Sequence, residues 1–208
     1  MTVLCIAPHP DDEAIGCGGT LRLHANRGDR VVVVFLTSGE LGLDHLTREE
    51  AHRIREGEAA EAAAILGTAR TEFLRQPDWF TGDHVDTVAA FLAEILRTEK
   101  PARIYLPHPD ESHPDHRAAL PIARAALQVA ARKSELYAYE IWTPLIRAEE
   151  LEDIAPVLIE KLRAIRCYRS QLTSYRYDRA ARALAQYRGI LHAGARYAEA
   201  FEILEEKL

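Results

Sequence analysis

The feature that most limits the fold of this chain is the alternation of short strand-like runs with longer helical segments over its first half. The run Val31–Thr37 is continuously apolar and rich in β-branched residues, which is typical of a strand buried on both faces. Val3–Ala7, Thr71–Leu74 and Arg103–Leu106 are three further candidate strands. A strand, helix, strand, helix order predicts an α/β fold with a doubly wound, mostly parallel sheet and helices on both faces.

Two helices between these strands carry recognisable end signals. Thr47 and Glu50 have the spacing of a capping box, and Gly67 is a typical stop signal for the same helix. The next helix is expected to begin with Asp83 as its N-cap and to end before Pro101. A helix thus separates successive strands, as a parallel sheet requires.

The second half of the chain is less regular from about residue 143. The sequence predicts a strand over Leu136–Trp142, helices over Val157–Tyr168 and Arg179–Tyr187, and a closing strand over Tyr197–Leu204. Pro121 falls inside the helix expected over residues 116–131, so that helix should either start later or bend. Without repeats, low-complexity stretches or linkers, we expect a single domain over residues 1–208.

Charge, cysteine content and hydropathy exclude several classes of protein. The net charge of −6 argues against a nucleic-acid partner, because phosphate binding needs an excess of Lys and Arg. Cys5, Cys17 and Cys167 are too few and too scattered for a disulfide framework or a cysteine-rich zinc site. No apolar run approaches the roughly 18 residues of a membrane span, and the N-terminus lacks the basic segment of a signal peptide. We therefore expect a cytoplasmic protein without a membrane or nucleic-acid partner.

A cluster of ionisable residues, His9-Pro10-Asp11-Asp12-Glu13, directly follows the first expected strand. This position lies at the carboxyl ends of the strands, where doubly wound sheets bind ligands. The three carboxylates of the cluster repel one another unless a cation or protons relieve them. An Asp that caps the next helix beside a loop histidine is the ordinary alternative, but it leaves most of the cluster unexplained. We expect His9 and Asp12 to face one point, with Asp11 free to act on a water.

The glycine-rich stretch Gly16-Cys17-Gly18-Gly19 is a weak match to a dinucleotide-binding motif. Leu21 occupies the position of the third glycine, and the acidic cluster would face the pyrophosphate. We interpret the glycines as sites of close helix–strand packing and Cys17 as a small buried residue. The sequence thus disfavours a nucleotide-dependent oxidoreductase.

A second cluster, His108-Pro109-Asp110-Glu111-Ser112-His113-Pro114-Asp115-His116, follows the fourth expected strand. In the common 3-2-1-4 strand order, strands one and four are neighbours, so the two clusters should converge. They would offer His9 and Asp12 together with one or more of the residues His113, Asp115 and His116. The alternative is a set of surface histidines in a proline-rich loop, with Asp115 as a helix cap.

Two imidazoles and a carboxylate with an open fourth position are typical of a catalytic zinc site. Zinc makes its bound water acidic enough to attack at neutral pH, and manganese or iron(II) accept the same ligand types. Asp11 would then take a proton from that water, and a histidine outside the ligand set would stabilise a developing oxyanion.

Both clusters resemble the signature motifs of the LmbE-like, or PIG-L-type, N-deacetylase family. Pro8–Glu13 resembles its first motif and His113–His116 resembles its second, in the same order and strand context. The resemblance implies a Rossmann-like fold and zinc-dependent removal of the acetyl group from an N-acetylglucosamine-type substrate. The site residues that it implies are His9, Asp12 and His116 as metal ligands, Asp11 as general base, His113 as oxyanion stabiliser, and Asp115 as the residue that orients or tunes His113.

Weaker similarities extend along most of the chain, at Thr37–Glu40, Arg55–Glu58, Tyr168–Gln171 and Tyr197–Phe201. The last two resemble the branch that deacetylates N-acetylglucosaminyl malate in bacillithiol synthesis. The family resemblance also implies substrate contacts by Arg55 and Asp78, and a homo-oligomer. Otherwise Arg55 would be an exposed helix charge paired with neighbouring glutamates. Glu111 stands where some relatives place an aromatic residue, so the surroundings of the oxyanion would differ.

The remaining histidines and tryptophans carry less information. Four histidines have no evident partner and are expected at the surface: His24, His45, His52 and His84. His192 is a candidate for reaching the site from the second half of the chain. Trp79 and Trp142 are candidates for stacking on a sugar ring, although packing is the more frequent use of such residues.

We therefore hypothesise a zinc-dependent hydrolase that deacetylates a small N-acetylated amino sugar or its conjugate. A metal-dependent amidase on another acylated amino sugar or thiol conjugate would share every ligand and differ only in its substrate pocket. A metal-binding structural protein without turnover is disfavoured, because a structural zinc site normally closes with four ligands.

Overall fold

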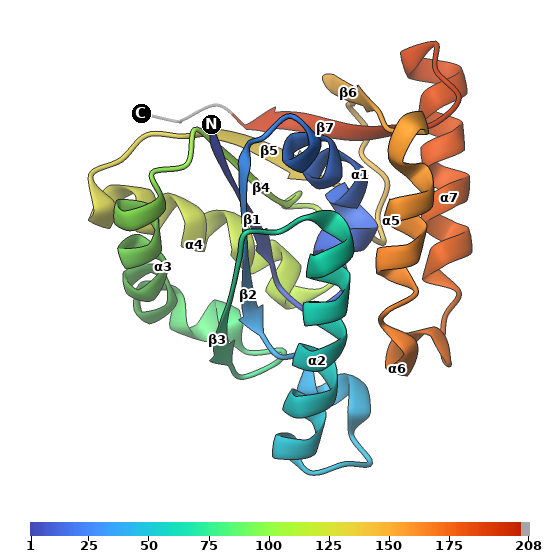
Figure 1. Ribbon diagram of the computed structural model, residues 1–208. Helices are drawn as coiled ribbons and strands as arrows, with labels where there is room; N and C mark the ends of the chain where they lie inside the picture. The colour runs from blue at the N-terminus through green and yellow to red at the C-terminus, as the bar shows by residue number, and fades with distance from the viewer. Residues whose placement is uncertain (205–208) are drawn as a thin grey trace.

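Seven strands form one sheet in the computed structural model, which describes residues 1–204 (Figure 1). The strands are β1 (Thr2–Ala7), β2 (Arg30–Thr37), β3 (Arg70–Gln76), β4 (Arg103–Pro107), β5 (Glu135–Tyr139), β6 (Glu150–Asp153) and β7 (Ala198–Leu204). Their order in space is β3-β2-β1-β4-β5-β7-β6. The strands β1 to β5 pair in parallel, whereas β7 is antiparallel to both β5 and β6. The expected α/β class and the 3-2-1-4 order are therefore confirmed.

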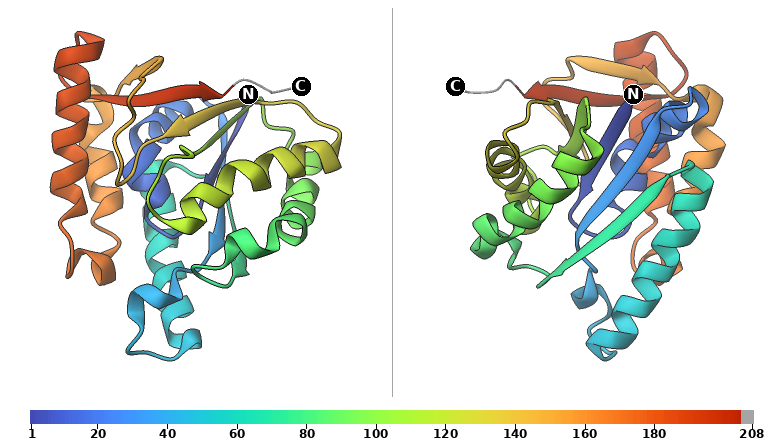
Figure 2. Two further views of the ribbon diagram at one scale, coloured as in Figure 1. Left: turned by 180° about the vertical axis from the view of Figure 1, so that it is seen from behind. Right: turned by 60° about the vertical axis from the view of Figure 1, so that its left-hand side comes forward.

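Helices cover both faces of the sheet, as Figures 1 and 2 show. One face carries α1 (Asp12–Asn26), α2 (Arg48–Leu66), α5 (Leu158–Ile165) and α7 (Tyr177–Arg188), and the other carries α3 (Val85–Glu99) and α4 (Pro114–Ala130). The shorter pieces are η1 (Glu40–Leu43), η2 (Thr81–His84), η3 (Ala155–Val157), α6 (Arg169–Leu172) and the π-helical turn η4 (Gly189–Ala193). None of the helices within residues 1–204 is long and apolar enough to span a membrane.

The apolar run of β2 follows from its position between two cores. Val33 and Phe35 pack into the core beneath α1 and α2, while Val32 and Val34 pack into the core beneath α3 and α4. Because successive side chains of a strand point to opposite faces, a strand covered on both faces needs apolar residues at every position.

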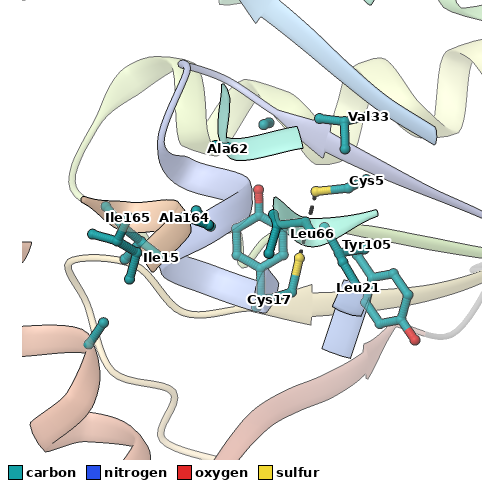
Figure 3. Close-up of a cluster of buried hydrophobic side chains, with 14 of the residues drawn as sticks. Cys5, Ile15, Cys17, Leu21, Val33, Ala62, Leu66, Tyr105, Ala164 and Ile165 are labelled. Carbon is teal, nitrogen blue, oxygen red and sulfur yellow. Dashed lines mark hydrogen bonds between the residues drawn. The ribbon is translucent and has the colours of Figure 1, made fainter. Parts of the chain in front are cut away.

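Close packing around the start of α1 explains the glycine-rich stretch. A Cβ atom on Gly16 would lie 2.2 Å from Cδ2 of the Tyr139 ring, and one on Gly19 would lie 2.6 Å from Cγ2 of Ile154. Figure 3 shows Cys17 in the same core, with its sulfur 3.6 Å from the sulfur of Cys5. The predicted packing role of the glycines and the burial of Cys17 are confirmed.

A buried ion pair crosses this region where α1 is irregular. At Cys17 the backbone leaves helical geometry, with φ −135° and ψ 19°. The Lys161 ammonium donates to the Ile15 carbonyl and to Glu199 Oε1, both at 2.6 Å. Glu199 in turn accepts hydrogen bonds from the amides of Gly19 and Thr20 at 2.8 and 2.7 Å. The pair thereby satisfies polar backbone groups on both sides of the irregularity.

The helix-end signals were correct for both ends of α2 and for the end of α3, which stops at Glu99 before Pro101, but the N-cap predicted for α3 was wrong. Thr47 and Glu50 form the predicted capping box, and Gly67 ends α2 in the left-handed conformation. Asp83 does not cap α3, because η2 runs directly into that helix and places His84 at the N-cap position. Cap prediction from sequence misses such short 3₁₀ turns.

The structure also corrects two expectations about Pro121 and His24. Helix α4 starts earlier than expected, at Pro114, and continues through Pro121. Pro121 and Arg117, whose carbonyl loses its helical partner, both lie on the exposed side of α4, where water can replace the missing bond. His24 is buried rather than exposed, because its ring bonds to Asp29 at 2.7 Å and to the Tyr105 hydroxyl at 2.9 Å.

Candidate metal and catalytic site

The two clusters of ionisable residues meet at the carboxyl ends of β1 and β4, which pair in parallel. They border a cavity of about 710 Å³. Six of the predicted site residues line it, namely His9, Asp11, Asp12, Arg55, Asp78 and His113, and the fully buried Asp115 and His116 lie directly behind them. The predicted convergence of the two clusters is thus observed.

Three donor atoms, which we term the donor triangle, lie at nearly equal separations. His9 Nδ1 is 3.2 Å from Asp12 Oδ2 and 3.3 Å from His116 Nε2, and His116 Nε2 is 3.3 Å from Asp12 Oδ2. A tetrahedral zinc ion with bonds of about 2.0–2.1 Å holds its ligand atoms roughly 3.3–3.4 Å apart. The donor triangle therefore fits one face of such a coordination shell.

The charges around the donor triangle also suit a cation. Burial alone would raise the pKa of Asp12, but His116 and His9 hold it well below its usual range. Burial would lower the pKa of His116, yet the Asp12 carboxylate raises it to about 9. Protons on the imidazoles thus balance the carboxylates, and a divalent ion would replace those protons.

The second nitrogen of His9 is held by two carboxylates. Nε2 lies 3.1 Å from Asp78 Oδ1 and 3.2 Å from Asp115 Oδ2. These contacts favour a proton on Nε2 and leave Nδ1 free as a metal donor, a common arrangement for metal-binding histidines. Asp115, expected to orient His113, reaches that ring through its backbone amide, which donates to His113 Nδ1 at 3.2 Å, whereas its carboxylate lies 4.0 Å from His113 Nδ1 and 3.2 Å from His9 Nε2.

Two other groupings of side chains could hold an ion. In the first, His9, His113 and His116 each offer a ring nitrogen, and these atoms lie within 4.8 Å of one another. In the second, ring nitrogens of His9 and His113 and carboxylate oxygens of Asp78 and Asp115 lie within the same distance of one another. In the second grouping the Asp115 oxygens already accept hydrogen bonds from the amides of Trp79 and Thr81. The donor triangle, whose atoms lie 3.2–3.3 Å apart, leaves His113 free for another role.

His113 is poised as a neutral hydrogen-bond donor. It is the N-cap of α4, and its Nδ1 accepts from the Asp115 amide at 3.2 Å, so the ring proton resides on Nε2. Burial, together with the neighbouring His9 and His116, lowers its pKa to about 4. Asp115 is not the cap that one sequence-based alternative proposed.

Asp11 is held in a strained conformation beside the donor triangle. Its φ of 129° is rare for a residue with a side chain. Its amide donates to Glu13 Oε2 at 3.1 Å, and Arg55 Nη2 lies 3.7 Å from its carboxylate. Burial raises the pKa of Asp11 to about 7 despite the opposing charge of Arg55. Strained residues of perturbed pKa at a cavity are typical of functional sites.

Glu13, which accepts the hydrogen bond from the Asp11 amide, is itself bound by a residue far away in the sequence. The Tyr168 hydroxyl donates a short hydrogen bond to Glu13 Oε1. Both side chains are buried, and burial raises the pKa of Glu13 to about 8. Tyr168 is visible in the sequence only as part of a weak similarity, since its separation of 155 positions from Glu13 hides this contact.

Arg55 and Asp78 are buried at the cavity rather than exposed. Arg55 Nη2 donates to the Pro10 carbonyl at 2.6 Å, while its Nε and Nη1 have no hydrogen-bond partner among residues 1–204. Asp78 is engaged by His9 and by the Leu41 amide, at 3.1 Å each. Arg55 thus has unused donors for a ligand, whereas Asp78 contacts the predicted metal ligand His9.

The rest of the cavity wall is more apolar and aromatic. Small and aliphatic residues of α7 line it, including Ala180, Ala181 and Leu184. Trp79 and Trp142 border the opening, where their rings lie 4.6 and 5.6 Å from the His113 ring. The exposed His192 packs against Tyr187 instead and is not among the cavity-lining residues.

Comparison with known proteins finds de-N-acetylases among the proteins similar to this chain. A family model described as PIG-L, GlcNAc-PI de-N-acetylase, matches residues 4–127. Diacetylchitobiose deacetylase from Thermococcus kodakarensis is 32% identical over 95% of this chain and 80% of its own length. A probable N-acetyl-alpha-D-glucosaminyl L-malate deacetylase from Bacillus cereus is 31% identical over 81% of this chain and 83% of its own. The solved N,N'-diacetylchitobiose deacetylase from Pyrococcus horikoshii has a TM-score of 0.86 and 30% identity, covering 98% of this chain and 83% of that one.

Proposed function

Because this chain belongs to the PIG-L (LmbE-like) family of de-N-acetylases, we propose that it hydrolyses the acetamide of an N-acetylglucosamine-type sugar or conjugate with the help of a divalent metal ion. The donor triangle beside the strained Asp11, at the edge of a cavity, is the observation that carries this proposal. The products would be acetate and the free amino sugar.

The metal would be held by His9, Asp12 and His116. Two nitrogens and a carboxylate oxygen suit zinc, and they are also acceptable to iron(II) and manganese(II). A bound ion of this kind supplies Lewis acidity, which lowers the pKa of a coordinated water and polarises the acetamide carbonyl.

Asp11 is the general base of the proposed reaction. A carboxylate with a pKa near 7 accepts a proton at neutral pH and can return it later in the cycle. Asp11 takes a proton from the attacking water as the water oxygen bonds to the carbonyl carbon. When the carbon–nitrogen bond breaks, the carboxyl delivers this proton to the leaving nitrogen.

His113 stabilises the negative charge that develops on the carbonyl oxygen. Its Nε2–H is available because Nδ1 already accepts the Asp115 amide hydrogen. Removal of one such donor typically slows a reaction by about 10²–10³-fold.

Arg55 and the two tryptophans are the proposed substrate contacts. The unpaired Nε and Nη1 of Arg55 would donate to sugar oxygens. Trp79 and Trp142 would pack against the apolar face of the ring. Asp78 lines the cavity too, and its predicted substrate contact would add to its hydrogen bond with His9.

A larger acyl group is the second candidate substrate. The apolar surface of α7 within the cavity offers space for an alkyl chain without a polar partner. In that case the same machinery would act as an amidase on another acylated amino sugar or conjugate. The homo-oligomeric state implied by the family resemblance and the cytoplasmic location expected from the sequence remain predictions.

Amine release from a substrate panel tests the proposal. The panel contains N-acetylglucosamine, diacetylchitobiose, N-acetylglucosaminyl malate and their N-butyryl counterparts, each incubated with zinc-loaded protein. We expect release from at least one acetylated sugar, and a loss of about 10²–10⁴-fold in Asp11→Asn. Asp86→Asn, which alters an exposed carboxylate of α3, is the matched control. Full activity of Asp11→Asn, or no release by the loaded wild type, would contradict the proposal.

A further inference from the structure

Glu111 is a buried carboxylate that anchors one side of the cavity opening. Its side chain is inaccessible to solvent. Its Oε1 accepts three consecutive backbone hydrogen bonds, from the amides of Ile141, Trp142 and Thr143, at 2.8, 3.0 and 3.2 Å. These bonds fix the backbone that carries the Trp142 indole to the cavity.

The other oxygen of Glu111 faces a predicted metal ligand. Oε2 lies 3.7 Å from His116 Nδ1, and neither atom has a hydrogen-bond partner within residues 1–204. His116 contributes its other nitrogen, Nε2, to the donor triangle. A metal on Nε2 requires the imidazole proton on Nδ1, where Glu111 Oε2 is the acceptor in position to receive it.

Asp115 makes the corresponding connection between His9 and Trp79. Its Oδ2 contacts His9 Nε2 at 3.2 Å and accepts the Trp79 amide at 2.7 Å. Trp79 has a φ of 75°, a conformation that needs such support in a residue with a side chain. Each histidine of the donor triangle is therefore backed by a carboxylate that also holds the backbone of a half-exposed tryptophan.

We propose that Glu111 is a positioning residue that couples metal occupancy at His116 to the placement of Trp142 as a wall of the sugar-binding opening. The inference rests on the proposed function, which supplies the metal and the sugar. The Trp142 ring lies 5.2 Å from the His116 ring, and the residue is 48% exposed. A small shift of His116 and Glu111 therefore moves an indole surface that a pyranose ring can contact. The carboxylate of Glu111 thus orients the metal ligand His116 through Oε2 and the substrate-contacting Trp142 through Oε1.

The Glu111→Gln variant separates these two connections. The three backbone amides can be accepted only by the glutamine oxygen, so the glutamine NH₂ must face His116 Nδ1. There it donates to Nδ1 and favours the tautomer with the proton on Nε2, the nitrogen that the metal needs. We expect zinc affinity to fall about 10- to 100-fold, as for other partners of metal-binding histidines.

The chain's two tryptophans allow a direct optical test. In a Trp79→Phe background, Trp142 is the single tryptophan, and its fluorescence is followed while the metal-free protein is titrated with zinc against a chromophoric chelator. We expect zinc binding to change the emission and quenching of Trp142 in the parent. This response should be lost in Glu111→Gln even at the higher zinc concentrations that saturate the variant. Glu94→Gln, on the exposed surface of α3, is the control and should behave as the parent.

The outcomes distinguish this inference from the proposed function. If Glu111→Gln binds zinc as tightly as the parent with the same fluorescence response, the coupling is refuted while the deacetylase proposal stands. If the wild type binds none of zinc, iron(II) and manganese(II), both fall. Should Glu111→Gln fail to fold, nitrogen-detected NMR of the zinc-loaded wild type replaces it. A downfield, slowly exchanging Nδ1 proton on His116 would support the bond to Glu111, and a rapidly exchanging one would refute it.

Discussion

Replacing Lys161 by Met would test how the start of α1, and with it Asp12, is held in place. Lys161 is 1% exposed and donates to the Ile15 carbonyl and Glu199 Oε1 at 2.6 Å each. Methionine fills a similar volume but offers no charge and no donor. The variant leaves the Glu199 carboxylate buried without its positive partner, and leaves the Ile15 carbonyl without its donor.

The expected cost follows from what remains around Glu199. Its oxygens keep the hydrogen bonds from Gly19 and from the amide and hydroxyl of Thr20. Breaking a buried ion pair by removing one partner typically costs about 3–5 kcal/mol, a large share of the roughly 5–15 kcal/mol that stabilises an average protein. The double variant Lys161→Met/Glu199→Gln removes the uncompensated charge, so we expect it to recover about 1–3 kcal/mol of this loss.

Urea denaturation of the wild type, both single variants and the double variant measures these free energies of unfolding. Zinc titration of the same four proteins shows whether loosening α1 also weakens the site, and we expect Lys161→Met to bind zinc less tightly. The reasoning fails if Lys161→Met costs less than about 1 kcal/mol, or if the two single changes simply add in the double variant.

Three further predictions concern other parts of the molecule. Gly16→Ala places a Cβ 2.2 Å from the buried Tyr139 ring, so the free energy of unfolding in urea should fall by at least about 1–3 kcal/mol, whereas an unchanged value would refute the packing argument. Tyr168→Phe removes the donor to Glu13, so unfolding free energy should fall by about 1–3 kcal/mol and kcat should fall while zinc content stays the same; unchanged kcat would show that Asp11 does not need this support. Arg30 lowers the pKa of Glu99 to about 2, so Glu99→Gln should cost about 1 kcal/mol at pH 7, and this difference should shrink as the pH falls from about 4.5 toward 2. A pH-independent difference in urea titrations would contradict the last prediction.

The parallel part of the fold could be predicted because each element carries its own local signal. The continuous apolar run of β2 and the capping box at Thr47 need no knowledge of distant contacts. The edge strand β6, with the sequence Glu150-Leu151-Glu152-Asp153, has no such signal and is defined by its pairing with β7. Edge strands exposed to solvent need no apolar run, so their sequence resembles that of a loop.

The candidate site was predictable where its residues are close in sequence. His9, Asp12 and His116 stand in two short clusters, and the strand order brings those clusters together. The partners that hold them were not predictable in the same way. Glu111 is bound by backbone amides about thirty residues away, which no side-chain pattern reveals. The contact of the Asp115 carboxylate with the His9 ring, closer than its 4.0 Å approach to His113, depends on ring orientation, which sequence spacing does not determine.

His24 shows a different reason for a wrong prediction. Its partner Asp29 lies only five residues away, at 2.7 Å, but Tyr105 reaches it from β4. Burial of a histidine depends on both nitrogens finding partners, and the second partner becomes visible only in the folded chain.

The metal content of the protein decides whether His9, Asp12 and His116 form a metal site. Tag-free wild-type protein and His116→Ala would be reconstituted with zinc, iron(II) or manganese(II), freed of excess ion and analysed by mass spectrometry. We expect about one ion per chain in the wild type and its loss in the variant, because His116 supplies one of the three proposed ligands. A wild type that retains no ion under any of these conditions would contradict the proposed metal site and the hydrolytic mechanism built on it.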